Sequence, residues 1–69
     1  MINLDERYHS YLNTNKRFNI DGVNERVVGY GYSDDGKSLT GYYVTTENYQ
    51  MHYDMKGNFK RKELRNLNN

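Results

Sequence analysis

The sequence predicts an α+β fold, with one N-terminal amphipathic helix packed on an antiparallel β-meander of three or four strands. Three observations support this prediction. Apolar residues recur at helical spacing over residues 3–14, runs rich in Val, Tyr and Thr follow from residue 25 onward, and short turn signals separate those runs. Connections this short force antiparallel neighbours, because a parallel crossover needs about a dozen residues or more. A chain of 69 residues has room for a single small domain.

The helix is predicted over residues 3–14. Asn3 is a suitable N-cap, and Glu6 three residues later completes a capping-box pattern. One buried face follows helical spacing and consists of Leu4, Tyr8, Tyr11 and Leu12. Asn13 or Asn15 can end the helix, since asparagine tolerates left-handed conformations. A helix this short is marginal in water, so we expect it to pack on the strands that follow.

Four strands are expected after the helix, at residues 25–33, 38–46, 49–54 and 58–64, of which the fourth is weaker. Before them, a short extended piece at residues 18–20 ends at the turn pair Asp21-Gly22. Residues 65–69 carry no pattern and are expected to fray.

Short turns between the strands predict the register. A turn with Gly36 in the left-handed region gives two pairs, Ser33 with Lys37 and Val28 with Tyr42. The turns at residues 47–48 and 55–57 give three more pairs, Val44 with Met51, Tyr42 with Tyr53, and Tyr53 with Phe59.

These registers agree on which side chains share a face of the sheet. The first face carries Val28, Tyr30, Tyr32, Tyr42, Val44, Tyr49, Met51, Tyr53 and Phe59. The opposite face carries Val27, Gly29, Gly31, Leu39, Gly41, Tyr43, Gln50, His52, Asp54, Lys60 and Lys62. We expect the helix to cover the first, aromatic face.

Residues 31–38 match the P-loop string G-x-x-x-x-G-K-[ST], in which backbone N–H groups cradle phosphates at the start of a helix. Here a β-branched and aromatic run follows at residues 39–46. Asp34 and Asp35 would also repel the phosphates. The expected structure is therefore a hairpin turn, and no nucleotide is expected.

A second string, Tyr53-Asp54-Met55-Lys56-Gly57-Asn58-Phe59, resembles the Y-D-x-x-G-N core of the YD repeats in Rhs-type shell proteins. It occurs once, whereas that family carries tandem copies, so the resemblance implies no function. We interpret the string as a hairpin in which the Asp54 side chain bonds the turn amides.

No catalytic or metal-binding constellation stands out. The chain has no cysteine, and Ser10, Ser33 and Ser38 have no obvious histidine partner. His52 and Asp54 share a strand face, but two ligands fall short of the usual three or four of a metal site. We therefore expect no enzyme, no cofactor and no metal.

The one basic concentration is Lys60-Arg61-Lys62. In an extended strand Lys60 and Lys62 would project together, beside His52 and, farther across the sheet, Tyr43. Basic side chains among aromatic ones on an open sheet can bind phosphates and stack bases. Alternatively, the lysines protect an edge strand against aggregation. The candidate partner-binding residues are Tyr43, His52, Lys60, Arg61 and Lys62.

Composition and charge favour a protein partner. Hydrophobic residues make up 35% of the chain and include eight tyrosines, so an exposed aromatic patch is expected on so small a sheet. The formal net charge of +1 is too balanced for a whole-molecule attraction to nucleic acid. Residues 1–6 lack the charge and apolar core of a secretion signal, and no apolar run approaches the ~20 residues of a membrane span. A cytoplasmic protein without membrane contact is the default expectation.

The leading hypothesis is a small non-enzymatic binding protein, a regulator or inhibitor that occupies a surface on another protein. Frequent asparagine and a very short chain are similar in style to small accessory proteins of bacteriophages, mobile elements and low-GC bacteria. One alternative is a nucleic-acid-binding module that uses the basic and aromatic sheet face. A second alternative is a structural homodimer that pairs through a sheet edge or exposed tyrosines.

Overall fold

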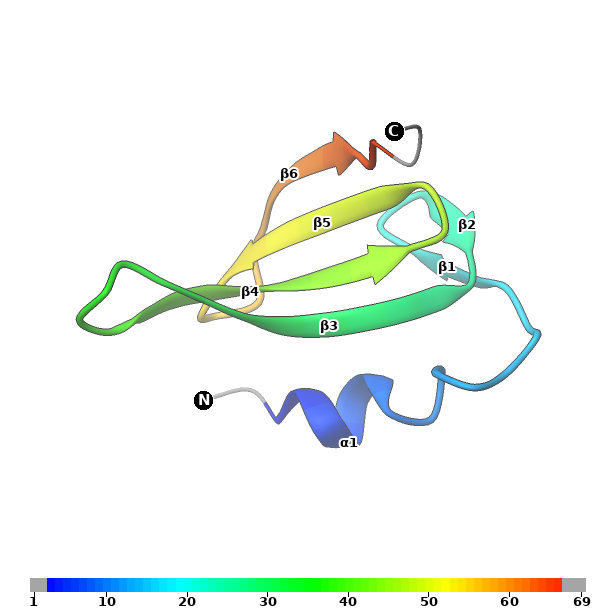
Figure 1. The fold of residues 1–69 in the computed structure, drawn as a ribbon, viewed down its shortest axis with the longest axis horizontal. Helices are drawn as coiled ribbons and strands as arrows, with labels where there is room; N and C mark the ends of the chain where they lie inside the picture. The colour runs from blue at the N-terminus through cyan, green and yellow to red at the C-terminus, as the bar shows by residue number, and fades with distance from the viewer. Residues whose placement is uncertain (1–2, 67–69) are drawn as a thin grey trace.

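The computed structural model describes residues 3–66 and consists mostly of antiparallel β-sheet, with six strands in two sheets and one short helix in that range (Figure 1). The elements are α1 (Leu4–Tyr8), β1 (Phe18–Ile20), β2 (Val23–Glu25), β3 (Val27–Asp34), β4 (Leu39–Thr46), β5 (Tyr49–Asp54) and β6 (Phe59–Leu64). The first sheet pairs β1 with β2, and the second has the order β3-β4-β5-β6. The predicted α+β class is thus confirmed in part, with less helix and more strand than expected.

Helix α1 is shorter than predicted. Asn3 caps it as expected, since its Oδ1 accepts a hydrogen bond from the backbone N–H of Glu6 at 3.2 Å. The chain then continues in turns and leaves the helical region at Asn13, whose φ is +63°. The second half of the predicted helix contains weak helix formers, and the Thr14 hydroxyl donates instead to the carbonyl of Tyr11 at 3.0 Å. The predicted face survives, with Leu4 and Tyr8 buried and Tyr11 and Leu12 packed against the core.

The β1–β2 hairpin is an element that the sequence reasoning missed. Asp21 and Gly22 form its two-residue turn with φ values of +50° and +87°, and Asn19 Oδ1 accepts from the N–H of Gly22 at 3.2 Å. Val23 follows the turn and is buried in the core. The Tyr53 hydroxyl donates a hydrogen bond to the Asp21 carboxylate, which fastens the hairpin tip to β5. The extended piece and the turn pair were predicted correctly, but their return strand was not.

Helix α1 and the β1–β2 hairpin together cover one face of the four-stranded sheet. The buried core consists of Leu4, Tyr8, Val23, Val27, Tyr42, Val44, Met51 and Tyr53. Tyr42 stacks on Tyr53 with ring centroids 4.8 Å apart and planes 11° from parallel. Burial raises the pKa of the Tyr8 phenol to about 12, and contact with Tyr42 adds to the effect against an opposing influence of Arg7. The helix therefore covers part of the aromatic face, as expected, and the hairpin covers the rest.

The β3–β4 register differs from the predicted one by four residues. Ser33 opposes Gly41 instead of Lys37. The turn begins later than expected because the Asp35 carboxylate accepts hydrogen bonds from the N–H groups of Lys37 and Ser38 at 2.9 and 3.0 Å. The turn accounts for three residues of this shift, and a register irregularity next to Ser33 accounts for the fourth. Because four is an even number, most side chains remain on their predicted faces.

A β-bulge near Val28 reverses one assignment. Val27 is only 1% exposed, whereas Val28 is 40% exposed. The prediction that Val28 faces the core and Val27 the opposite side is therefore wrong, because the bulge adds one residue and inverts the alternation. The predicted pair of Val28 with Tyr42 is also wrong, since Tyr32 opposes Tyr42. The β4–β5 pairs and the pair of Tyr53 with Phe59 are confirmed.

Both motif-like strings are hairpin turns, as predicted. Residues 31–38 lead from β3 into β4 rather than into a helix, and Gly36 has a φ of +92°. Figure 1 shows this β3–β4 hairpin extending beyond the other strands. In the second string, Asp54 Oδ1 accepts from the N–H groups of Lys56 and Asn58 at 2.8 and 2.9 Å. These hydrogen bonds stabilise the turn that joins β5 to β6.

Arg65 does not fray. Its backbone N–H donates to the Asn48 carbonyl at 2.8 Å, and its Nη1 donates to the carbonyls of Thr46 and Glu47 at 2.7 and 3.2 Å. The predicted frayed tail is wrong at this residue, because the guanidinium satisfies two carbonyls of the β4–β5 turn. Residues 67–69 of that predicted tail lie outside the described residues.

Glu25, the last residue of β2, links the β1–β2 hairpin to the β4–β5 turn. Its Oε1 accepts from Thr46 Oγ1 at 2.7 Å and from the Asn48 N–H at 2.9 Å, and its Oε2 accepts from Asn48 Nδ2 at 2.8 Å. Burial alone would raise the pKa of Glu25, but the hydrogen bonds from Asn48 and Thr46 outweigh it and lower the pKa below 4.5. The carboxylate form is therefore the one that stabilises the fold.

Glu25→Gln should lower the free energy of unfolding at pH 7 by about 1–2 kcal/mol, because an amide group would replace one acceptor and face the Asn48 amide. A carboxylate with a lowered pKa stabilises the fold above its unfolded pKa and loses this contribution as the pH falls through the folded pKa. Urea unfolding should therefore show a difference between wild type and variant at pH 7 that shrinks in acid, below about pH 4. A difference that stays constant over this range would contradict the assignment.

Candidate functional site

The second face of the four-stranded sheet lies opposite the side that α1 and the β1–β2 hairpin cover. We call it the open face. Its side chains include those of Tyr43 and Thr45 from β4, Gln50 and His52 from β5, and Arg61 and Glu63 from β6, and β3 contributes the bare backbone of Gly31. Four of the five residues predicted to bind a partner lie on it or at its rim, as described below.

Tyr43 lies flat across the neighbouring strand. It opposes Gly31 directly, and a Cβ added at Gly31 would lie 2.5 Å from the Tyr43 hydroxyl oxygen. The glycine thus leaves room for the ring, which packs on its backbone. On the other side, the Tyr43 ring lies 6.2 Å from the imidazole of His52, centroid to centroid. The ring is therefore held between two strands rather than free in solvent.

His52, Arg61 and Glu63 form a cluster beside Tyr43. His52 Nε2 lies 2.6 Å from Glu63 Oε1, a contact that is an ion pair when the imidazole is protonated. Arg61 Nε lies 3.6 Å from the same carboxylate oxygen. The His52 side chain is 14% exposed, whereas those of Arg61 and Glu63 are more than half exposed. The pairs contribute little stability at such exposure, and the cluster leaves both signs of charge accessible on the open face.

The lysines of β6 do not gather beside Tyr43. A register irregularity next to His52 displaces β6 by one residue, so that Arg61 opposes His52. Lys62 lies on the other side of the sheet, with its Nζ 4.8 Å from the centre of the Tyr49 ring. Lys60 remains at the rim of the open face, where it helps to line a hollow of about 110 Å³. The prediction that Lys60 and Lys62 project together beside His52 is wrong because a bulge inverts the alternation.

The sequence reasoning placed Gly31 on this face but missed its contact with Tyr43, and it missed Glu63 altogether. Glu63 pairs with His52 and Arg61, and Gly31 supplies the surface on which Tyr43 rests. The spacing of Arg61 and Glu63 by two residues was a usable signal, since both must share a strand face. It was obscured because the predicted register placed the lysines there instead.

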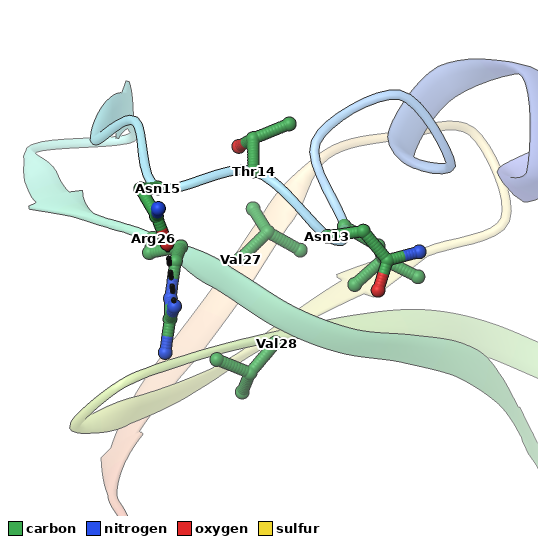
Figure 2. A pocket seen from close by; sticks show the side chains of 7 residues that line it. Asn13, Thr14, Asn15, Arg26, Val27 and Val28 are labelled. Atoms are coloured by element: carbon green, nitrogen blue, oxygen red, sulfur yellow. Dashed lines mark hydrogen bonds between the residues drawn. The ribbon is translucent and has the colours of Figure 1, made fainter.

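A second hollow lies between the loop after α1 and the start of β3 (Figure 2). It has a volume of about 450 Å³ and is lined by Leu12, Asn13, Thr14, Asn15, Arg26, Val27 and Val28. Arg26 Nη1 donates to Asn15 Oδ1 at 3.5 Å, the hydrogen bond drawn in Figure 2. One guanidinium among side-chain amides suits a small anionic group. The hollow is wide open and offers one charged residue, so it is a weaker candidate than the open face.

His52 and Asp54, weighed as metal ligands from the sequence, use their side chains separately. His52 faces Glu63, while Asp54 accepts the turn hydrogen bonds before β6. Across residues 3–66, no three His, Asp or Glu side chains gather where they could hold a metal ion. In the same part of the chain, no helix is long and apolar enough to cross a membrane.

Comparison with known proteins adds no relative to this picture. No protein-family model matches the chain, and no curated protein or solved structure is significantly similar to it. Function must therefore be argued from the surfaces of this chain, of which the open face is the best defined.

Proposed function

We propose that this chain is a small non-enzymatic binding protein, a regulator or inhibitor, that uses the open face of its sheet to occupy a surface on another protein. One observation carries the proposal. Tyr43, His52, Arg61 and Glu63 come from three adjacent strands and form a continuous aromatic and charged patch on the uncovered side of the sheet. Tyrosine and arginine are the residues that most often anchor protein interfaces.

The aromatic part of the patch is already ordered before a partner arrives. Gly31 and His52 hold the Tyr43 ring, whereas the exposed Arg61 and Glu63 side chains are restrained only weakly by their ion pair. Burying Tyr43 on association therefore costs little side-chain entropy, which is the main penalty for flexible interface residues. A partner surface with its own acidic and basic groups could pair with the Arg61 and Glu63 charges at once.

The shape of the hollows fits this function. An enclosed substrate site would need a cavity, whereas the hollows found among residues 3–66 are open. Open hollows favour surface recognition over catalysis.

The nucleic-acid alternative has less support. Lys62 lies on the far side of the sheet from Tyr43. Arg61 lies beside Glu63, whose carboxylate repels phosphates. The edge-paired homodimer also has less support, since two copies of β6 would bring Lys60, Arg61 and Lys62 close to like charges.

Photo-crosslinking tests the proposed function. A photoreactive phenylalanine analogue in place of Tyr43, in cells that produce the chain, should crosslink to one protein, and excess wild-type chain should compete with the product. The same analogue at Lys37, which is exposed in the β3–β4 turn away from the open face, is the matched control and should give no such product. Arg61→Ala combined with Glu63→Ala should reduce crosslinking at position 43. Equal products at both positions, or crosslinks to nucleic acid alone, would overturn the proposal.

A further inference from the structure

We propose that β6 is a docking strand that binds an extended acidic segment of the partner protein by strand addition at the sheet edge. This inference rests on the proposed function and names the chemistry of the partner. All six residues of β6 are exposed, and within residues 3–66 the strand pairs with β5 alone. In Figure 1, β6 forms the border of the sheet on the side away from α1.

The backbone of β6 has hydrogen-bonding groups directed away from the sheet. The Arg65 N–H bonds the Asn48 carbonyl at 2.8 Å, and the register continues without a break from there to the pair of Arg61 with His52. In an antiparallel ladder, hydrogen-bonded and non-bonded pairs alternate along the strand. The N–H and C=O groups of Lys62 and Leu64 therefore point outward, where an incoming strand can meet them.

The charge of β6 selects the incoming strand. Lys60, Arg61, Lys62 and the following Arg65 are basic, and Glu63 is the one acidic residue among them. A second copy of β6 would place like charges opposite one another, which is unfavourable. An acidic residue opposite Lys62 would instead gain complementary charge.

Edge protection by lysine does not explain the apolar residues of β6. Phe59 is 46% exposed and Leu64 is 73% exposed, at the two ends of the strand. A strand built only to resist pairing would carry polar groups there. These two side chains supply the apolar contacts that an added strand needs beyond its backbone hydrogen bonds.

The side chains of β6 also define the pattern of the partner. Phe59 packs edge-on against the Tyr53 ring, with the ring centroids 5.7 Å apart, and Lys62 lies over the Tyr49 ring. Leu64 opposes Tyr49. All three side chains of β6 therefore project on the covered side of the sheet. The matching segment has an apolar residue at i, an acidic residue at i+2 and an apolar residue at i+4. Its acidic residue would lie opposite Lys62, between two apolar contacts.

A synthetic peptide tests this inference directly. The probe is Thr-Val-Thr-Glu-Thr-Val-Thr with blocked ends, and the control peptide has Lys in place of Glu. On titration into ¹⁵N-labelled chain, the probe should shift the backbone amide signals of Lys62 and Leu64 most strongly. The control should bind about threefold to tenfold more weakly, because an attractive exposed charge pair becomes repulsive. Equal binding of the two peptides, or shifts centred on Tyr43, would overturn the docking strand.

Two substitutions at one position separate the backbone from the charge. Lys62→Ala removes the charge and keeps the outward N–H, so the probe should bind about threefold to tenfold more weakly. Lys62→Pro also removes the N–H, which no ladder bond within residues 3–66 uses, so the fold should persist while binding falls at least about tenfold below that of Lys62→Ala. Equal binding by the Ala and Pro variants would overturn strand addition.

Leu64→Ser provides a readout should Lys62→Pro fail to fold. It removes an exposed apolar contact, and binding of the probe should weaken severalfold while the spectrum of the free chain stays native. Unchanged binding would contradict the proposed pattern, as would a concentration-dependent dimer that buries β6.

The peptide and crosslinking experiments test the two proposals separately. If the probe peptide does not bind while the crosslink at position 43 still forms, the docking strand is wrong and the proposed function stands. If no crosslink forms but the probe binds β6, the open face is wrong as the contact surface.

Discussion

Gly41→Ala should lower the free energy of unfolding by about 3 kcal/mol, a large part of the roughly 3–10 kcal/mol expected for a domain of this size. Gly41 is buried in β4 opposite Asp54, and a Cβ added there would lie closer than 3.0 Å to the carbonyl oxygen of Tyr53. The obstacle is backbone, which cannot rotate away as a side chain can. Relief would require separating β4 from β5, and these two strands carry half of the buried core residues.

Gly29→Ala is the matched control for this substitution. Gly29 lies in β3 of the same sheet, and an added Cβ would meet Thr45 Cβ at an ordinary 3.8 Å. We expect a change within about 0.5 kcal/mol, or a small gain from the reduced entropy of the unfolded chain. Urea unfolding of the two variants and wild type measures both effects. Similar losses for Gly29→Ala and Gly41→Ala would mean that crowding at the Tyr53 carbonyl is not the cause.

Tyr42→Ala should lower the free energy of unfolding by about 3–5 kcal/mol, enough to leave a large unfolded population at room temperature. The Tyr42 side chain is fully buried and stacks on Tyr53 in the centre of the core. Its hydroxyl also accepts a hydrogen bond from Arg7 Nη1 at 3.3 Å, which links α1 to the sheet. Truncation would therefore open a cavity and detach the helix at the same time.

Tyr42→Phe separates these two contributions. The variant keeps the ring and its stack on Tyr53 but loses the contact of the hydroxyl with Arg7, so we expect a loss of about 1 kcal/mol. Thermal unfolding followed by circular dichroism would measure both variants. If Phe and Ala at this position cost the same, the hydroxyl rather than ring packing holds the core together.

Much of the sheet could be predicted because its signals are local. The Glu47-Asn48 turn sets the pairing of Val44 with Met51, and the Asp54 side chain builds the turn before β6. Each depends on residues within a few positions of one another. Turn chemistry and the two-residue alternation of strands are properties of short segments, so a sequence reveals them.

The candidate site was only partly predictable. Tyr43 and His52 were expected on one surface and lie there, whereas Arg61 takes the place beside His52 that was predicted for the lysines, and Lys62 lies on the other side of the sheet. A single bulge in β6 makes this difference. Glu63 replaces the lysine as the charged neighbour, so the surface carries both signs of charge rather than a basic stripe.

Taken alone, the sequence determined the Asn3 helix cap, the turns that join β4 to β5 and β5 to β6, and most of the aromatic side chains that face the core. These follow from capping, turn chemistry and alternation, and they survived even a four-residue change of register. Only the tertiary structure decided the bulges beside Val28 and in β6, the position of the β1–β2 hairpin on the core, and the hydrogen bond by which Glu25 links this hairpin to β4. The position of a bulge depends on which of two neighbouring side chains fits beneath elements distant in the sequence. That choice belongs to packing, and it inverts every side chain beyond the bulge.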